Sequence, residues 1–304
     1  MTQAFEIIGM GYASQDNLVT VPRIPLDDKV EIISSLLQGG GPGATATVAA
    51  ARLGARTAFI GAVGDDERGK AILDEFRREG VNVDFVFIQQ GVVSPAAYCW
   101  IDSRSSGRSI AWTRGGISPL SEDLLPADEI RAAKLLHLDG HHTRAAIAAA
   151  EIAKKAGTTI SLDAGTILDG MGQLVELADI VIASEVFARE FTGEADLNKA
   201  ARRLHRCGKT KFAGVTAGKN GSIGFDGVHE YHQASFAVEV VDTTGAGDVY
   251  HGAFAYQHLK GGDWSECMRF ASAVAAMKCT ELGGRSGIPT QLRAEQFLRS
   301  SKCT

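Results

Sequence analysis

The segment DTTGAGD at residues 242–248 places a carboxylate and two glycines at a predicted strand-to-helix turn. Residues 238–241 (VEVV) favour a strand, and residues 249–259 follow a helical pattern. The free N–H groups and the dipole of such a helix start stabilise an anion, such as a phosphoryl group in transfer. Asp248 would lie in the first helical turn, where its carboxylate can take a proton from an attacking hydroxyl. The alternative is a tight turn followed by an ordinary helix-terminal charge.

Two further glycine-rich turns suit ligands of other kinds. Residues 216–221 (TAGKNG) follow a predicted strand and offer a hydroxyl, a lysine and backbone amides, which suit a polyphosphate. Residues 39–45 (GGGPGAT) run directly into a predicted helix, where backbone without side chains lets a compact polar ligand approach closely. The alternatives are an ordinary hairpin and an ordinary loop.

Two more familiar nucleotide signatures are incomplete. Residues 64–71 (GDDERGKA) match a P-loop except that Ala71 replaces the Ser or Thr that holds magnesium. Residues 9–14 (GMGYAS) follow a strand like a dinucleotide fingerprint, but Ser14 replaces the third glycine and prolines interrupt the expected helix. An NAD(P)-dependent dehydrogenase, which would depend on residues 9–14, is therefore a weaker alternative.

The elements that must position these turns alternate along the chain. Apolar strands alternating with amphipathic helices predict an α/β fold, with a mostly parallel central sheet covered by helices on both faces. Two β-like stretches, about 13–37 and 84–115, predict a small separate sheet. No internal repeat or linker is visible, so we expect a single domain over 1–304, with a core formed by residues 1–12, 38–83 and 116–304.

The composition excludes several classes of protein. Hydrophobic residues make up 45% and charged residues 22%, so a large core can form. The net charge of −5 argues against nucleic-acid and anionic-membrane partners. Five scattered cysteines without a CxxC pair, and no signal peptide, favour reduced thiols and a cytoplasmic location. The 35 glycines in 304 residues exceed the usual share of about 7%, which indicates tight turns or close approach to a ligand.

In this order, the three glycine elements resemble the ribokinase-like, or pfkB-type, carbohydrate kinases over essentially the whole chain. The resemblance depends on the segments GGGPGATATVAAARLGARTAFIGAVGDD at 39–66 and VVDTTGAGDVYHGAF at 240–254. It implies ATP-dependent phosphorylation of a sugar hydroxyl, with ATP, Mg²⁺ and K⁺ as expected cofactors. It also implies that the small sheet is a lid through which two copies of the chain form a homodimer.

The resemblance implies roles for individual residues as well. Asp248 would be the general base, and the anion hole would be formed by Gly245, Ala246 and Gly247. Sugar hydroxyls would be held by Asp16, Gly40, Gly41 and Thr45. The nucleotide would be bound by Thr216, Gly218, Lys219, Gly221, Ala276 and Gly283. Asp242 would help to bind a monovalent cation near the anion hole.

The chain also departs from the family pattern. An Asn-x-x-Glu motif that serves the magnesium–phosphate network is replaced by SEVF at 184–187, where Glu185 would act through water. The missing pair leaves open a catalytically weak protein that senses sugars or nucleotides. Thr45 replaces an asparagine of ribokinases, which disfavours ribose. Residues 278–289 and the SEVF segment look most like sulfofructose kinases, in which Lys29 and His141 would fall near an anionic end of the sugar.

Overall fold

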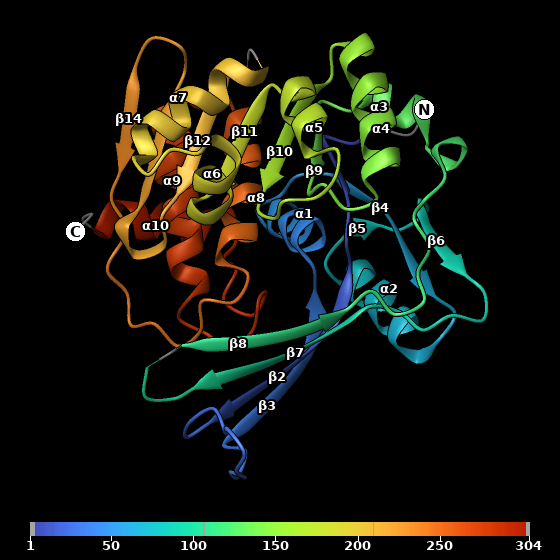
Figure 1. Cartoon of the computed structure of the whole chain (residues 1–304), viewed down its shortest axis with the longest axis vertical. Coiled ribbons are helices and arrows are strands. Elements are labelled where there is room, and N and C mark those ends of the chain that lie inside the picture. The colour runs from blue at the N-terminus through green and yellow to red at the C-terminus, as the bar shows by residue number, and fades with distance from the viewer. Residues whose placement is uncertain (1–3, 106, 209, 302–304) are drawn as a thin grey trace.

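A computed structural model describes residues 4–105, 107–208 and 210–301 of the chain (Figure 1). The strands are β1 (Ile7–Met10), β2 (Ser14–Val21), β3 (Ser34–Gly40), β4 (Thr57–Gly64), β5 (Val81–Asn82), β6 (Val86–Gln89), β7 (Ala96–Asp102), β8 (Arg108–Thr113), β9 (Leu135–Leu138), β10 (Thr159–Ala164), β11 (Ile180–Ser184), β12 (Phe212–Thr216), β13 (Ser222–Phe225) and β14 (Glu230–Gln233). The α-helices are α1 (Pro42–Arg52), α2 (Glu67–Arg78), α3 (Ala127–Ala132), α4 (Thr143–Ala156), α5 (Met171–Leu177), α6 (Glu185–Thr192), α7 (Leu197–Gly208), α8 (Ala246–Leu259), α9 (Trp264–Lys278) and α10 (Gln291–Ser300). Short 3₁₀ turns are η1 (Glu122–Leu124) and η2 (Gly218–Asn220).

The main sheet runs through the centre of the molecule (Figure 1). Its strand order is β14-β13-β12-β11-β10-β9-β1-β4-β5, and β6 also pairs with β4. The pairs from β12 to β5 are parallel, whereas β13 and β14 add an antiparallel edge. The predicted α/β fold with a mostly parallel sheet is therefore confirmed.

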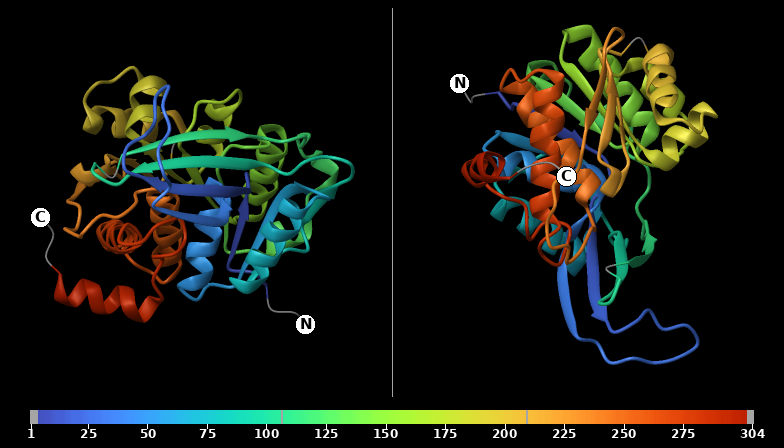
Figure 2. Two further views of the ribbon diagram at one scale, coloured as in Figure 1. Left: turned by 90° about the horizontal axis from the view of Figure 1, so that it is seen from below. Right: turned by 90° about the vertical axis from the view of Figure 1, so that its left-hand side faces the viewer.

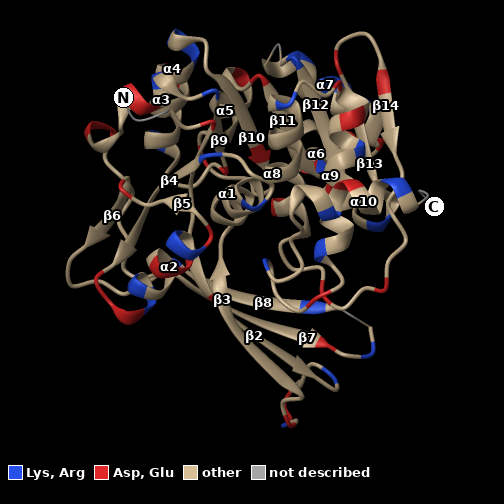
Figure 3. Cartoon of the chain, turned by 180° about the vertical axis from the view of Figure 1, so that it is seen from behind, with Lys and Arg blue, Asp and Glu red and all other residues tan. Residues whose placement is uncertain are grey.

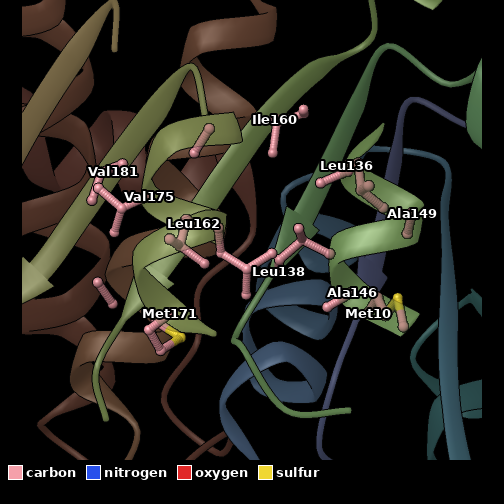
Figure 4. Packing of buried hydrophobic residues seen from close by; sticks show 14 of the residues in the cluster. Met10, Leu136, Leu138, Ala146, Ala149, Ile160, Leu162, Met171, Val175 and Val181 are labelled. Atoms are coloured by element: carbon pink, nitrogen blue, oxygen red, sulfur yellow. The ribbon is translucent and has the colours of Figure 1, made fainter. Parts of the chain in front are cut away.

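Side chains of the parallel strands are buried on both faces of the sheet, which explains their continuous apolar runs. On β11, Ile180 and Ile182 belong to a buried cluster with α1, α2, α8 and α9. Val181, between them, belongs to the cluster on the other face, formed with α3 to α7. Figure 4 shows this second layer, where Leu162 of β10 packs near Met171 of α5. The two helix layers hold the strand ends, and so the turns that follow them, in fixed positions.

A second sheet, which we call the lid, has the strand order β3-β2-β7-β8. It projects from one end of the main sheet (Figure 2). Strand β2 pairs antiparallel with β3 and parallel with β7, so two distant segments of the chain form one layer. The ladder begins at Ser14 and Gly40, next to the main sheet, and ends at Thr20 and Ser34. The predicted small separate sheet is therefore present.

Two local predictions were wrong. Residues 84–95 were expected in the lid, but β6 pairs in parallel with Gly61–Gly64 of β4 in the main sheet. Strand β4 is eight residues long and β5 pairs only with its start, so the rest of its edge is open to β6. Residues 238–241 form no strand, because the amide N–H groups of Val241 and Asp242 donate to the carbonyl oxygen of Cys279 instead.

The surface carries charges of both signs. Figure 3 shows Lys and Arg interspersed with Asp and Glu over the helices and the lid. Among the described residues, no helix has the length and hydropathy needed to cross a membrane. Cys99, Cys207, Cys267 and Cys279 are free thiols, whereas Cys303 lies outside the described residues.

Helices α1 and α8 cross closely at Gly252, so a larger side chain there should destabilise the fold. A Cβ atom at Gly252 would lie 2.1 Å from the carbonyl oxygen of Ala46. Gly252→Ala should therefore push the helices apart and lower the free energy of unfolding by about 1–3 kcal/mol in urea titrations. The control is Gly172→Ala in α5, where a Cβ would meet nothing within 4 Å and should be neutral or stabilising. Equal stability of Gly252→Ala and the wild type would contradict the close crossing.

Candidate active site

Gly245 caps the start of α8 in a conformation that favours glycine. Its φ is 72°, and a Cβ there would lie 3.0 Å from the Cα of Gly284. No side chain caps this helix, so its first N–H groups can serve an anion. The N–H of Ala246, however, donates to the carbonyl oxygen of Thr243 at 3.2 Å. Of the three predicted anion-hole residues, Ala246 is thus engaged within the turn, while Gly247 is exposed at its tip.

Asp248 lies in the first turn of α8, as predicted, and is half-buried. Burial raises the pKa of Asp248 to about 7, and the nearby charge of Asp163 adds to the rise. Asp163 Oδ1 lies 3.2 Å from Nε2 of the buried His251, which lowers the pKa of Asp163 although burial opposes the change. A carboxyl group that titrates near neutral pH beside an uncapped helix start is suited to accept a proton from a hydroxyl.

Asp242 is a buried residue that joins this turn to the segment after α9. Its Oδ1 accepts hydrogen bonds from the N–H and the hydroxyl of Thr244, at 2.8 and 2.7 Å. Its Oδ2 accepts from the N–H of Gly283 at 2.9 Å. Its main-chain oxygen accepts from Lys278 Nζ at 2.7 Å. The carboxylate therefore fixes the turn at 242–245 against residues 278–284.

The predicted phosphate-binding turn lies beside the start of α8. Strand β12 ends at Thr216, η2 follows, and Gly221 with φ of 83° leads into β13. The hydroxyls of Ser222 and Tyr250 are 3.0 Å apart, which ties this turn to the residue two positions after Asp248. The side of η2 that carries Gly218 and Lys219 is exposed. The two predicted phosphate-binding elements are therefore neighbours.

The predicted sugar-binding residues meet where β3 leads into α1. Gly41 has φ of 95°, and a Cβ there would lie 2.2 Å from the carbonyl oxygen of Tyr12. The carboxylate of Asp16 lies against Gly40, where a Cβ would come within 2.0 Å of it. Burial raises the pKa of Asp16, while a 2.6 Å hydrogen bond from the Ser14 hydroxyl opposes the rise. The structure thus brings Asp16, Gly40 and Gly41 together.

Arg285 is a fully buried residue that connects this loop to the anion-hole side of the site. Its Nη1 lies 2.9 Å from Glu75 Oε1, and its Nη2 donates to the carbonyl oxygen of Gly40 at 3.2 Å. Its Nε donates to the hydroxyl of Thr45 at 3.3 Å. Thr45 is predicted to bind sugar, but in this structure its hydroxyl oxygen accepts a hydrogen bond from Arg285.

Asp139 holds the loop at 39–45 from the other side. Its buried carboxylate accepts hydrogen bonds from the N–H groups of Tyr12, Gly43 and His141, each at 2.9 Å. A Cβ at Gly11 would lie 2.0 Å from Asp139 Oδ1. The glycine at position 11 is therefore explained by packing against Asp139.

A cavity of about 360 Å³ opens beside the sugar loop. His141 lines it, and its ring lies 5.1 Å from the ring of Tyr12. Arg114 and Arg144 also line the cavity, together with the single carboxyl group of Asp169, so positive charges outnumber negative ones in its lining. Burial lowers the pKa of the neighbouring His142 to about 4, with His141 and Arg114 contributing, so His142 is neutral at pH 7. The cavity is suited to a polar group that carries negative charge.

Some predicted site residues lie apart from this cluster. Lys29 is exposed in the connection between β2 and β3, at the end of the lid away from Gly40. Glu185 begins α6, where its carboxylate pairs with Arg189 at 2.8 Å. Ala276 is half-buried in the last turn of α9. Within the described part of the chain, no three His, Cys, Asp or Glu side chains converge as a metal site.

Several charged residues near the start of α8 were not predicted from the sequence. Asp139 and Asp163 stand at the carboxyl ends of β9 and β10, where parallel sheets place ligand-binding residues, so this signal was available. Lys278, Arg285 and Arg108 gave no local signal, because only the fold shows that they are buried or that they contact the turn. Arg108 of β8 donates to the hydroxyl of Thr243 and so links the lid to residues 242–248.

The raised pKa of Asp248 should be visible in the pH dependence of stability, independently of catalysis. In ¹³C NMR of the wild type, the Asp248 carboxyl should titrate near pH 7, with Asp248→Asn providing the assignment. Because the unfolded carboxyl has a pKa of about 4, the folded charge costs stability above that pH. Asp248→Asn should therefore raise the melting temperature at pH 8, and the gain should shrink from pH 7 downward and vanish near pH 4. A titration midpoint near 4 would contradict this environment.

The chain is similar in sequence to known kinases along most of its length. A model of the pfkB family of carbohydrate kinases matches residues 11–291. A ribokinase from Haemophilus influenzae is 32% identical over 299 residues, which cover 95% of this chain and 97% of that protein. A nucleoside kinase from Methanothermobacter thermautotrophicus is 26% identical over 295 residues, covering 95% and 94%.

The likeness extends to solved structures. The structure of Arabidopsis thaliana ribokinase complexed with ribose and ATP is similar, with a TM-score of 0.82 at 27% identity, over 97% of this chain and 99% of that one. The predicted resemblance is confirmed at the level of the family, and the dehydrogenase alternative is excluded. The likeness to sulfofructose kinases stays a prediction. The chain belongs to the pfkB family of carbohydrate kinases.

Proposed function

We propose that this protein transfers the γ-phosphoryl group of ATP to a hydroxyl of a sugar or sugar derivative. The observation that carries the proposal is Asp248, whose carboxyl has a pKa of about 7 beside the uncapped start of α8. The proton of the acceptor hydroxyl moves to Asp248 while its oxygen forms a bond to phosphorus and the bond to ADP breaks. The first N–H groups of α8, above all those of Gly245 and Gly247, stabilise the charge on the phosphoryl group in transfer.

The two substrates approach this point from opposite sides. The exposed turn with Thr216, Gly218, Lys219 and Gly221 binds the phosphates of the nucleotide, because it offers backbone amides and an ammonium group. The carboxylate of Asp16 and the backbone at Gly40 and Gly41 bind sugar hydroxyls. The lid contacts residues 242–248 through Arg108 and excludes water, which would otherwise compete as acceptor.

Magnesium bound to ATP would neutralise part of the phosphate charge. Glu185, the predicted contributor to its network, is paired with Arg189 and does not fit that role as it is arranged. Mg²⁺ usually keeps several waters and takes substrate phosphates as ligands, which is consistent with a site that has no converging carboxylates among the described residues. We therefore assign no catalytic step of this chain to Glu185.

The acceptor belongs to the sugars or sugar derivatives. Relatives that match along their whole length are described as ribokinase, nucleoside kinase and ATP-dependent ribose-1-phosphate kinase, so the family name alone does not select one. The cavity beside His141 is lined by Arg114 and Arg144 against one carboxyl group, that of Asp169, and this excess of positive charge favours an acceptor with a sulfonate, phosphate or carboxylate group. Acidic sugars therefore belong in the first screen together with ketoses, aldoses and nucleosides.

The test is an ATP-to-ADP assay across these acceptors. The wild type should form ADP only when an acceptor is added, and Asp248→Asn should lower kcat by about 10²–10⁴-fold while still binding ATP. The matched control is Asp128→Asn, a change of the same kind at an exposed site of α3, which should keep full activity. ATP binding without acceptor-dependent turnover would instead support the alternative of a sensing protein. Near-normal turnover of Asp248→Asn would remove the assignment of the base.

The lid is also the proposed homodimer interface. On its outer face, away from Asp16, the exposed Leu37 of β3 and Tyr98 of β7 lie on either side of Asn17 of β2 in one row. Apolar groups exposed on a sheet in this way are typical of an interface. Leu37→Glu should therefore convert a dimer into a monomer in sedimentation experiments. Leu292→Glu, at an equally exposed leucine of α10, should leave the dimer intact, and a monomeric wild type at micromolar concentration would contradict the proposal.

A further inference from the structure

Lys278 is a charged residue in an unusual place. It ends α9 and its exposed fraction is 0%, although lysine is almost never fully buried unless it has a partner. Its Nζ donates to the main-chain oxygen of Asp242 at 2.7 Å. Burial lowers the pKa of Lys278, while the charges of Asp242 and Asp248 favour its protonated form. The structure thus holds the Lys278 ammonium group in contact with the turn at 242–248.

The position of this ammonium group matters because Asp242 organises the anion hole. The Asp242 carboxylate holds Thr244 and Gly283, and Gly284 packs directly against Gly245 at the start of α8. The positively charged Lys278, which donates to the Asp242 carbonyl oxygen, therefore helps to hold the turn at 242–248 in place. It also adds positive potential near the point where the phosphoryl charge develops.

The family resemblance implies that Asp242 helps to bind a monovalent metal cation. The residues around Asp242 do not fit such an ion. The Lys278 ammonium group faces the Asp242 carbonyl oxygen at 2.7 Å, and both carboxylate oxygens of Asp242 accept from protein donors, so fewer lone pairs and less space are left for a metal cation. A second cation beside a buried ammonium group would also be repelled strongly, since the local dielectric constant is low. The site is therefore already supplied with one positive charge.

We infer that the ammonium group of Lys278 takes the place of the monovalent cation, so that this kinase works without K⁺. Lysine is suited to this substitution because its charged group is compact and carries three donors that can point at carbonyl oxygens. The inference rests on the proposed kinase function for its catalytic part. Its structural part, the exclusion of K⁺ from Asp242, does not depend on catalysis.

The first experiment compares the wild type in potassium chloride and in tetramethylammonium chloride at equal ionic strength. The expected result is the same kcat in both salts and the same melting temperature. A kcat that requires K⁺, or a melting temperature that rises specifically with K⁺, would overturn the inference. The melting temperature remains informative if no acceptor is found, so failure of the inference and failure of the proposed function are distinguishable.

The second experiment uses Lys278→Ala, which removes the charge and leaves space for a cation. In tetramethylammonium chloride its kcat should fall by about 10²-fold or more, and added K⁺ or methylammonium should restore it in a saturable way. K⁺ should also raise the melting temperature of this variant. Lys260→Ala, at an exposed lysine of the same domain, is the control and should resemble the wild type in both salts.

A further variant, Lys278→Met, separates charge from packing. Its side chain fills the space of the lysine stem without the charge, so kcat should fall but K⁺ should not restore it. Full activity of Lys278→Met without K⁺ would overturn the inference, because the charge would then have no function. If Lys278→Ala fails to fold, Lys278→Met and the salt dependence of the wild type still decide the question.

Discussion

The buried carboxylate of Asp242 is the interaction on which the rest of the site depends. It accepts hydrogen bonds from Thr244 and from Gly283, which are 39 residues apart in the chain. An ionised carboxylate is buried only when donors surround it, and here the donors are the backbone of two loops that the site must hold together. Removing the carboxylate would therefore leave buried N–H groups unpaired and release the start of α8 from the loop that Gly284 belongs to.

Arg285 follows Gly284 in the same loop and links this loop to residues 39–45. Its fully buried guanidinium pairs with the partly exposed Glu75 and binds the carbonyl oxygen of Gly40. Breaking such a pair by removing one partner typically costs about 3–5 kcal/mol, because the other charge stays buried. Residues 283–285 therefore connect the turn at 242–248 with the loop at 39–45.

The sequence was sufficient for the fold and for the position of each glycine turn, because hydrophobic periodicity and glycine spacing are local signals. It also placed Asp248 in the first turn of α8, since the helical pattern starts directly after the turn. It was not sufficient for Lys278 or Arg285, because their burial depends on elements far away in the chain. The strand expected at 238–241 failed for the same reason: the carbonyl oxygen of Cys279 accepts its N–H groups.

The distribution of buried charge explains how one site can treat its two substrates differently. Burial raises the pKa of Asp248, and the nearby charges of Asp163, Asp139 and Asp16 add to the rise, while His251 opposes it. Lys278 and the start of α8 lie on the phosphate side and offset this negative charge. The proton affinity of Asp248 and the positive potential at the start of α8 are thus parts of one local balance of charge, to which Lys278 contributes an ammonium group.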